Sequence, residues 1–233
     1  MRARSAVRTS IMRSLGAVAG IIMGLTGGAA WAGVIAGTAH DFSIQGYSGG
    51  QICIACHTPH GGNTTVTDAP LWNHAVTTAT YTLYSSSTLN AGPLAQPSGV
   101  SKLCLSCHDG TVAIDSFGGA TGTNFVTGTK AMGSAAQGSL ANDHPIGFAY
   151  DAALVTLDGS LHNTTNSVTI GTGGTRTRTG TIASLLLFNG RLECASCHDV
   201  HNTFTASNGV GGGAPLLRVS KAGSAICLTC HNK

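Results

Sequence analysis

The chain has 233 residues, of which only 9% are charged, with 12 Lys and Arg against 9 Asp and Glu. Four of the basic residues and none of the acidic ones lie in the first 32 residues, which leaves eight basic residues against nine acidic ones. This near-neutral balance excludes a basic nucleic-acid-binding surface, and it favours self-association because few like charges keep copies apart.

Residues 1–32 have the pattern of a secretory signal peptide. A basic start precedes an apolar run from Leu15 to Thr26, and Ala30-Trp31-Ala32 offers small residues at a cleavage site. An uncleaved anchor is the alternative, but the run is short and rich in glycine for a membrane span. We therefore expect an exported protein whose mature part, residues 33–233, is a single domain without a transmembrane segment.

All the cysteines lie in four copies of Cys-x-x-Cys-His, at 53–57, 104–108, 194–198 and 227–231. This motif is the attachment site of c-type haem: the thiols bind the vinyl groups and the histidine ligates the iron. The expected attachment residues are Cys53, Cys56, Cys104, Cys107, Cys194, Cys197, Cys227 and Cys230. The expected proximal iron ligands are His57, His108, His198 and His231. Zinc knuckles and disulfides are alternatives, but neither explains a histidine after every second cysteine.

The motifs suggest a doubled two-haem unit, with halves around 33–118 and 190–233. In each half one motif is followed by a second histidine, His60 or His201, and the other is preceded by a serine, Ser101 or Ser224. Because the mature chain has few aromatic residues and little apolar periodicity, we expect the porphyrins to replace the usual core.

The expected fold is a mostly irregular, haem-cored multihaem cytochrome c with few short helices and short β-hairpins. Short helices are expected at the haem motifs. Residues 152–161 and 167–187 carry the best strand and hairpin signal, since Val, Ile, Thr and Leu alternate there with turn residues. Residues 119–139 are rich in glycine and are expected to form an ordered, irregular loop.

The histidine count predicts bis-histidine ligation. Ten histidines include four proximal ligands, and Met132 is the only methionine of the mature chain. Four sixth-coordination positions remain to be filled, and histidine in place of methionine implies low reduction potentials. The distal candidates, of which four are needed, are His60, His201, His144, His74 and His40. His162 lies in a polar stretch and is expected to be a surface residue.

Two of these candidates are restricted by their position. His60 and His201 follow a proximal histidine by three residues, so each lies on the same side of its own haem as the proximal ligand. Neither can therefore fill the sixth coordination position of the haem attached to its own motif. Each is therefore expected to reach a different haem packed closely against the first.

The order of these motifs resembles that of doubled-CxxCH multihaem c-type cytochromes, in particular the tetrahaem OmcE-type proteins of extracellular cytochrome filaments. The resemblance runs from His40 to His231 and includes His-Asp-Phe, Pro-Leu-Trp-Asn-His and Asp-His-Pro. It implies a continuous row of haems and one axial histidine supplied by the neighbouring subunit. On this basis His60 is expected to ligate the iron bound through His231 of a neighbour, in a head-to-tail homopolymer.

The leading function is therefore electron conduction through an extracellular or cell-surface filament, with upstream cytochromes and extracellular acceptors as redox partners. A monomeric periplasmic electron carrier is the first alternative. A multihaem reductase is the second, but it needs an open iron position and converging acid, base or anion-binding groups, for which the sequence gives no signal. No catalytic residues are expected.

Overall fold

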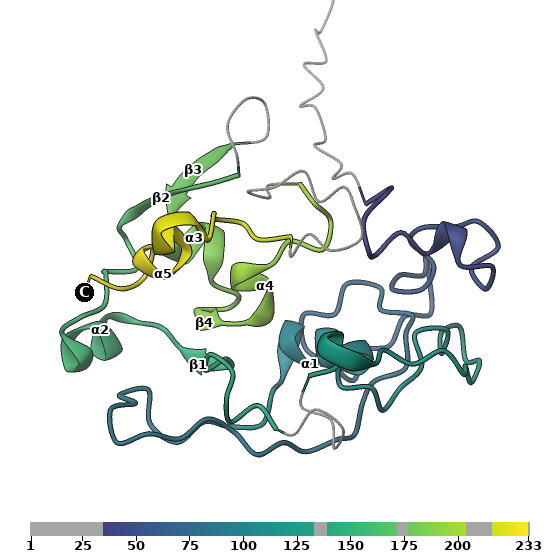
Figure 1. Ribbon diagram of the computed structural model, residues 1–233, viewed down its shortest axis with the longest axis horizontal. Helices are drawn as coiled ribbons and strands as arrows, with labels where there is room; N and C mark the ends of the chain where they lie inside the picture. Colours follow the sequence, from purple (N-terminus) through teal and green to yellow (C-terminus); the bar gives the residue numbers. More distant parts are fainter. Residues whose placement is uncertain (1–34, 133–138, 172–176, 204–215, 233) are drawn as a thin grey trace, which may run out of the picture. The chain divides into compact units, whose positions relative to one another are not determined.

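The computed structural model describes residues 35–132, 139–171, 177–203 and 216–232 (Figure 1). The chain is mostly irregular, with 22% helix and 14% strand, which confirms the expected fold class of short helices and two-stranded hairpins. The expected signal peptide, residues 1–32, lies outside the described residues. In the part that is described, no helix is long and apolar enough to cross a membrane.

The helices are short, and three of them carry haem motifs. The α-helices are α1 (Gly99–His108), α2 (Ala152–Asp158), α3 (Ile182–Leu186), α4 (Cys194–Cys197) and α5 (Ala225–Leu228), and the 3₁₀ helices are η1 (Phe42–Ile44), η2 (Gly128–Lys130) and η4 (Ala222–Ser224). Motif two lies on α1, motif three begins on α4 and ends one residue after it, and motif four begins on α5 and continues beyond its end. Motif one forms a single turn, in which the backbone amide of His57 donates to Cys53 at 2.8 Å. It does not continue as a helix because His57 enters a β-bridge with Trp72.

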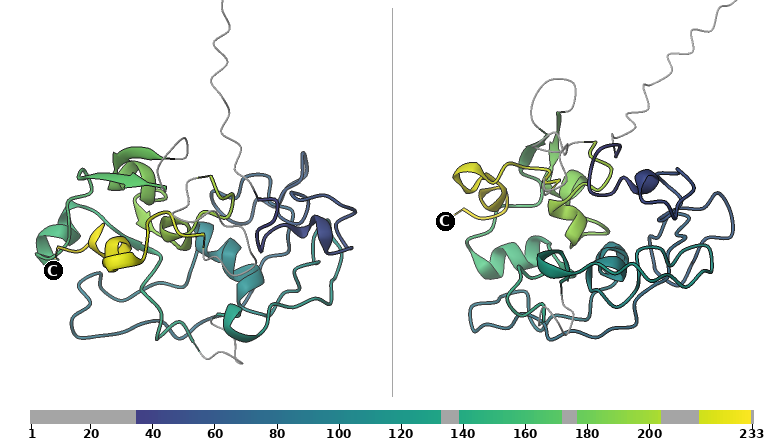
Figure 2. Two further views of the ribbon diagram at one scale, coloured as in Figure 1. Left: turned by 45° about the horizontal axis from the view of Figure 1, so that its top comes forward. Right: turned by 45° about the vertical axis from the view of Figure 1, so that its right-hand side comes forward.

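Two antiparallel strand pairs are present in the described residues. β1 (Phe148–Ala149) pairs with β4 (Arg191–Leu192), and β2 (Ser167–Ile170) pairs with β3 (Arg178–Thr181). The second pair confirms the hairpin expected within 167–187. α3 packs against both strands of this hairpin and against α4 (Figures 1 and 2).

Residues 152–161 do not form the expected strand. Seven of them form α2, because the Asp151 side chain accepts a hydrogen bond from the Leu154 amide at the amino end. Gly159 then ends the helix in the left-handed region, with φ of 68°. Local capping thus outweighs the β-branched residues on which the strand expectation depended. In the same way, Thr181 and Ser184 cap α3 reciprocally, so the apolar residues after β3 turn into a helix.

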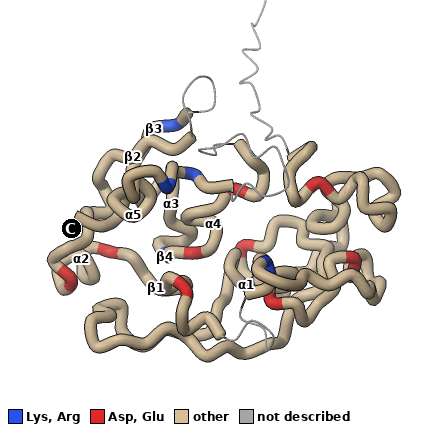
Figure 3. The backbone as a smooth tube through the Cα atoms, in the orientation of Figure 1, with Lys and Arg blue, Asp and Glu red and all other residues tan. Residues whose placement is uncertain are grey.

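The apolar core of the described residues is divided into small clusters. The largest has four buried members, Tyr150, Leu154, Ile182 and Leu192, and each of the others has three. Of the expected irregular loop, residues 119–127 contain no helix or strand, η2 follows, and residues 133–138 lie outside the described part. Charged residues are scattered singly along the described chain (Figure 3).

Candidate haem-binding site

The eight cysteines are free thiols that differ in exposure. Cys53 and Cys227 are exposed and the other six are half-buried. Burial raises the pKa of Cys56 to about 11, and it raises the pKa of Cys230 to the same value. These two thiols are therefore protonated and neutral in the folded chain at ordinary pH, like small apolar side chains.

Cysteines of successive motifs lie close enough to affect one another. The Cys107 thiol has its pKa raised by burial and then by Cys56. A hydrogen bond with Cys194, followed by burial, raises the pKa of Cys104. Burial, Cys194 and Cys227 raise the pKa of Cys197. The attachment points of motifs one to four therefore follow each other in space in the order of the sequence.

Two proximal histidines are oriented by backbone carbonyls. The Nδ1 atom of His57 donates to the Pro70 carbonyl at 2.8 Å, and that of His108 donates to the Lys130 carbonyl at 2.9 Å. His144 makes the same kind of bond, from Nδ1 to the Pro145 carbonyl at 2.9 Å. A proton fixed on Nδ1 leaves the lone pair on Nε2, which is the arrangement usual for histidines that ligate metals.

Three proximal histidines each lie beside a distal candidate: the His57 and His201 rings are nearly parallel, those of His108 and His40 are tilted by 53°, and those of His231 and His144 by 70°. The ring centroids of His57 and His201 are 6.1 Å apart with the rings inclined by 16°. Those of His108 and His40 are 6.0 Å apart, and those of His231 and His144 are 6.4 Å apart.

These separations match two imidazoles on one iron. Two metal–nitrogen bonds of about 2 Å, plus the distance from each nitrogen to its ring centre, place the centroids roughly 6.3 Å apart. In centroid separation, the three pairs are therefore compatible with the haem irons that the motifs imply.

His40 is suited to bind a metal as a neutral ligand. Burial, and next the neighbouring His108, lower its pKa to about 4. Its Nδ1 atom is buried and has no hydrogen-bond partner among the described residues. Desolvation also lowers the pKa of His201. Both imidazoles are thus neutral near pH 7, with a lone pair available for iron.

Two distal candidates have other surroundings. His74 is buried, and its two ring nitrogens lie 2.7 Å from the Ala75 carbonyl and 2.9 Å from the Ala113 carbonyl. The Nε2 atom also lies 3.5 Å from Sγ of Cys107, which places His74 beside motif two. His60 is exposed, and its imidazole makes no hydrogen bond or ring contact that the described residues reveal.

His60 of a neighbouring subunit was expected at the iron of His231, and a single chain does not test that pairing. Within this chain His144 lies beside His231, with ring centroids 6.4 Å apart. The reason is that the chain after α2 returns to motif four: the amide of His162 donates to the Cys230 carbonyl, and the Tyr150 hydroxyl donates to the His162 carbonyl. His162 itself is half-buried rather than a fully exposed surface residue.

Carboxylates fix the turns beside three haem-site histidines. Asp41, Asp109 and Asp199 directly follow His40, His108 and His198, and all three are buried. Each accepts a hydrogen bond from the backbone amide two residues further on, at Ser43, Thr111 and His201. The sequence signal for this role is the repeated His-Asp pair, which indicates an Asx-type turn.

Comparisons with known proteins add no family to this picture. No model of a protein family matches the chain, and no curated protein matches it in sequence.

Proposed function

We propose that the chain is a tetrahaem c-type cytochrome that conducts electrons along a row of bis-histidine haems. The observation that carries this proposal is the set of three histidine pairs at the spacing of one iron. Each pair joins a Cys-x-x-Cys-His histidine to one of the distal histidines expected from the sequence. Bound haem would supply one-electron redox chemistry at its iron.

The chain's own residues hold and orient these groups. Eight thioether bonds would fix the porphyrin edges, and the carbonyls of Pro70 and Lys130 would fix the ring orientation of His57 and His108. With histidine on both sides, an iron keeps a low reduction potential and no open position for a substrate. This supports an electron carrier over a reductase.

The row follows from how close the attachment points lie. Cys56 and Cys107, Cys104 and Cys194, and Cys197 and Cys227 are neighbours. Each haem would therefore lie beside the next one in the chain. Short steps between neighbouring haems are what conduction along a row requires.

We further propose that copies join head to tail into an extracellular filament. The resemblance of the motif order supports this, as do the near-neutral composition and the exposed imidazole of His60. By the symmetry of motifs one and three, His201 serves the first iron and His60 serves an iron attached to motif three. If that motif belongs to a neighbouring copy, the contact is heterologous and growth is open-ended.

A monomeric periplasmic carrier is the second candidate. The three observed pairs all lie within one chain, as a self-sufficient carrier requires. In this case His60 would serve motif three of its own chain. The two functions thus differ in whether the His60 ligand crosses between copies.

Purified, secreted protein tests both the haem content and the assembly of the chain. Haem content by the pyridine haemochrome assay should give four haems per chain, and electron paramagnetic resonance should show low-spin iron throughout. Negative-stain electron microscopy should show filaments. Monomers with wholly low-spin iron would favour the carrier, and a large high-spin fraction that binds carbon monoxide would favour a reductase.

A further inference from the structure

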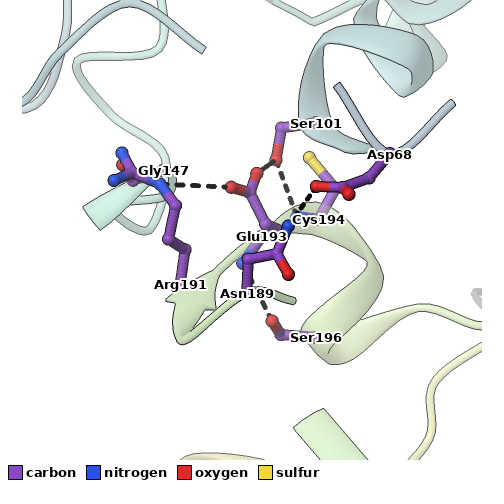
Figure 4. A network of polar contacts seen from close by, with 8 residues as sticks. All are labelled: Asp68, Ser101, Gly147, Asn189, Arg191, Glu193, Cys194 and Ser196. Atoms are coloured by element: carbon purple, nitrogen blue, oxygen red, sulfur yellow. Dashed lines mark hydrogen bonds and ion pairs between the residues drawn. The ribbon is translucent and has the colours of Figure 1, made fainter. Parts of the chain in front are cut away.

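A buried polar network joins α1, which carries motif two, to α4, which carries motif three (Figure 4). Ser101 is fully buried and Glu193 is 2% exposed. The Ser101 hydroxyl donates to Oε2 of Glu193, and the hydroxyl oxygen of Ser101 accepts from the backbone amide of Cys194 at 3.0 Å. One hydroxyl thus ties α1 to the residue before motif three and to its first cysteine.

Glu193 also has hydrogen-bond and ion-pair partners close to it in the sequence. Its backbone amide donates to the Ser196 hydroxyl at 2.8 Å, and Ser196 is itself buried. Its Oε1 lies 3.7 Å from Nε of Arg191, whose guanidinium also donates to the Gly147 carbonyl. The carboxylate therefore has partners on α1, on β4 and, through Arg191, on the segment before β1.

By itself, a buried polar network of this kind adds little to the stability of the fold. Taking a carboxylate out of water costs more than a typical hydrogen bond returns, and apolar replacements of buried ionic groups are often neutral or stabilising. What the network supplies is a defined relative position, because a hydroxyl–carboxylate contact holds at one distance whereas apolar side chains slide.

The position that it defines is that of two haem attachment points. Cys104 is one helical turn after Ser101, so its side chain lies on the same face of α1. Cys194 directly follows Glu193. α1 and α4 are in contact, and the two thiols are close enough to shift each other's pKa. Ser101 and Glu193 therefore lie beside two thiols that would hold the second and third haems.

We propose that the Ser101–Glu193 contact is a positioning device that fixes the spacing and mutual angle of the second and third haems. The inference rests on the proposed function, since it requires haem on both motifs. It also assigns a role to the serine three residues before motif two. Neither residue binds iron; both act through the backbone that carries Cys104 and Cys194.

The test compares holo-protein variants by circular dichroism in the Soret band, where closely spaced haems give a couplet that depends on their distance and angle. The variants are Ser101→Ala and Glu193→Ala, which remove the contact, and Glu193→Gln, whose amide oxygen still accepts from the Ser101 hydroxyl. Ser106→Ala is the matched control. Ser106 is equally buried on the same helix, but it donates to the Lys102 carbonyl and accepts from the Thr77 amide, away from α4.

With four haems retained, Ser101→Ala and Glu193→Ala should lose the part of the couplet that this haem pair contributes. Glu193→Gln and Ser106→Ala should keep the wild-type couplet. Should Glu193→Ala fail to fold, Glu193→Asp, one methylene shorter, should show the same loss. A wild-type couplet in Ser101→Ala, or an equal loss in Ser106→Ala, would overturn the inference and leave the proposed function intact. A wild-type protein without haem would instead overturn the proposed function itself.

Discussion

The imidazoles of His57 and His201 lie nearly parallel, 6.1 Å apart between centroids, although they belong to the first and third haem motifs. His201 reaches this place because Asp199 accepts hydrogen bonds from the amides of His201 and Thr203, which turns the chain directly after motif three. The fold thus brings the two sequence halves together at these two histidines. If the pair holds one iron, as proposed, neither half has a complete set of axial ligands by itself.

His201→Ala should leave the haem of motif one without its sixth ligand. All four haems should still be attached, because each Cys-x-x-Cys-His motif is intact. One haem in four should become high-spin, as measured by electron paramagnetic resonance and by the charge-transfer absorption band. His162→Ala is the control, since His162 belongs to none of the three pairs, and its iron should stay low-spin. Wholly low-spin iron in His201→Ala would contradict the assignment.

The sequence predicts candidate ligand residues but not which of them meet in the fold. Attachment sites follow from a five-residue pattern, so motifs and proximal histidines are local information. Pairing depends on which distant segments meet, and nothing near His144 or His40 in sequence specifies His231 or His108. Packing that the local sequence does not specify also places His74, which is buried beside Cys107 of motif two.

The same distinction applies to the fold. The β2–β3 hairpin was predictable from its composition, whereas α2 depended on Asp151 and Gly159 at its two ends, and these caps outweigh a strand-like interior. Glu193 is not part of a recognised sequence motif, so its burial against Ser101 was not predictable from local sequence. Long-range contacts decide these cases.

Replacing Asp109 should destabilise the protein more than a surface change would. Asp109 is fully buried and accepts hydrogen bonds from the hydroxyls of Thr77, Tyr81 and Thr111. Asp109→Ala leaves several buried donors without an acceptor, at a cost of about 3 kcal/mol in the free energy of unfolding. Denaturant unfolding of the holo-protein measures this cost. Asp109→Asn, which keeps an acceptor oxygen, should lose less, and equal losses would show that the hydrogen bonds are not responsible.

The buried Glu193 carboxyl predicts a dependence of stability on pH. Burial raises its pKa above 4.5, more than Ser101 and Arg191 lower it. As pH rises from 4.5 to the folded pKa, the unfolded chain loses this proton first and then binds fewer protons than the folded chain. The contribution of Glu193 to stability is therefore present below 4.5 and is lost as pH rises through the folded pKa.

Glu193→Gln isolates this effect because it removes the titration and keeps the shape. The free energy of unfolding of wild type minus that of the variant should fall as pH rises through this window. Denaturant unfolding at a series of pH values provides the measurement. A difference that increases with pH would mean that Arg191 dominates and that the carboxylate is stabilised in the fold.

Removing the haems should leave a largely unfolded chain. The described part has only small apolar clusters, the largest with four buried members, which offset little of the conformational entropy of ordering a chain of this length. A variant with all eight cysteines changed to alanine should show no cooperative thermal transition by calorimetry. A sharp transition with near-native circular dichroism would show that the polypeptide has a sufficient core of its own.

His60→Ala should separate assembly from haem attachment. His60 is exposed, whereas His201, its counterpart after motif three, already lies against His57 in the same chain. The variant should therefore retain four haems and a folded subunit but form no filaments in negative-stain micrographs. One haem should be high-spin, and by the symmetry of motifs one and three it should be the haem held by Cys194 and Cys197.

Mixing with wild-type subunits should cap growing ends and shorten filaments, because each variant subunit lacks one side of a heterologous contact. Normal filaments with wholly low-spin iron would exclude His60 as the bridging ligand, and monomers in both wild type and variant would favour the periplasmic carrier.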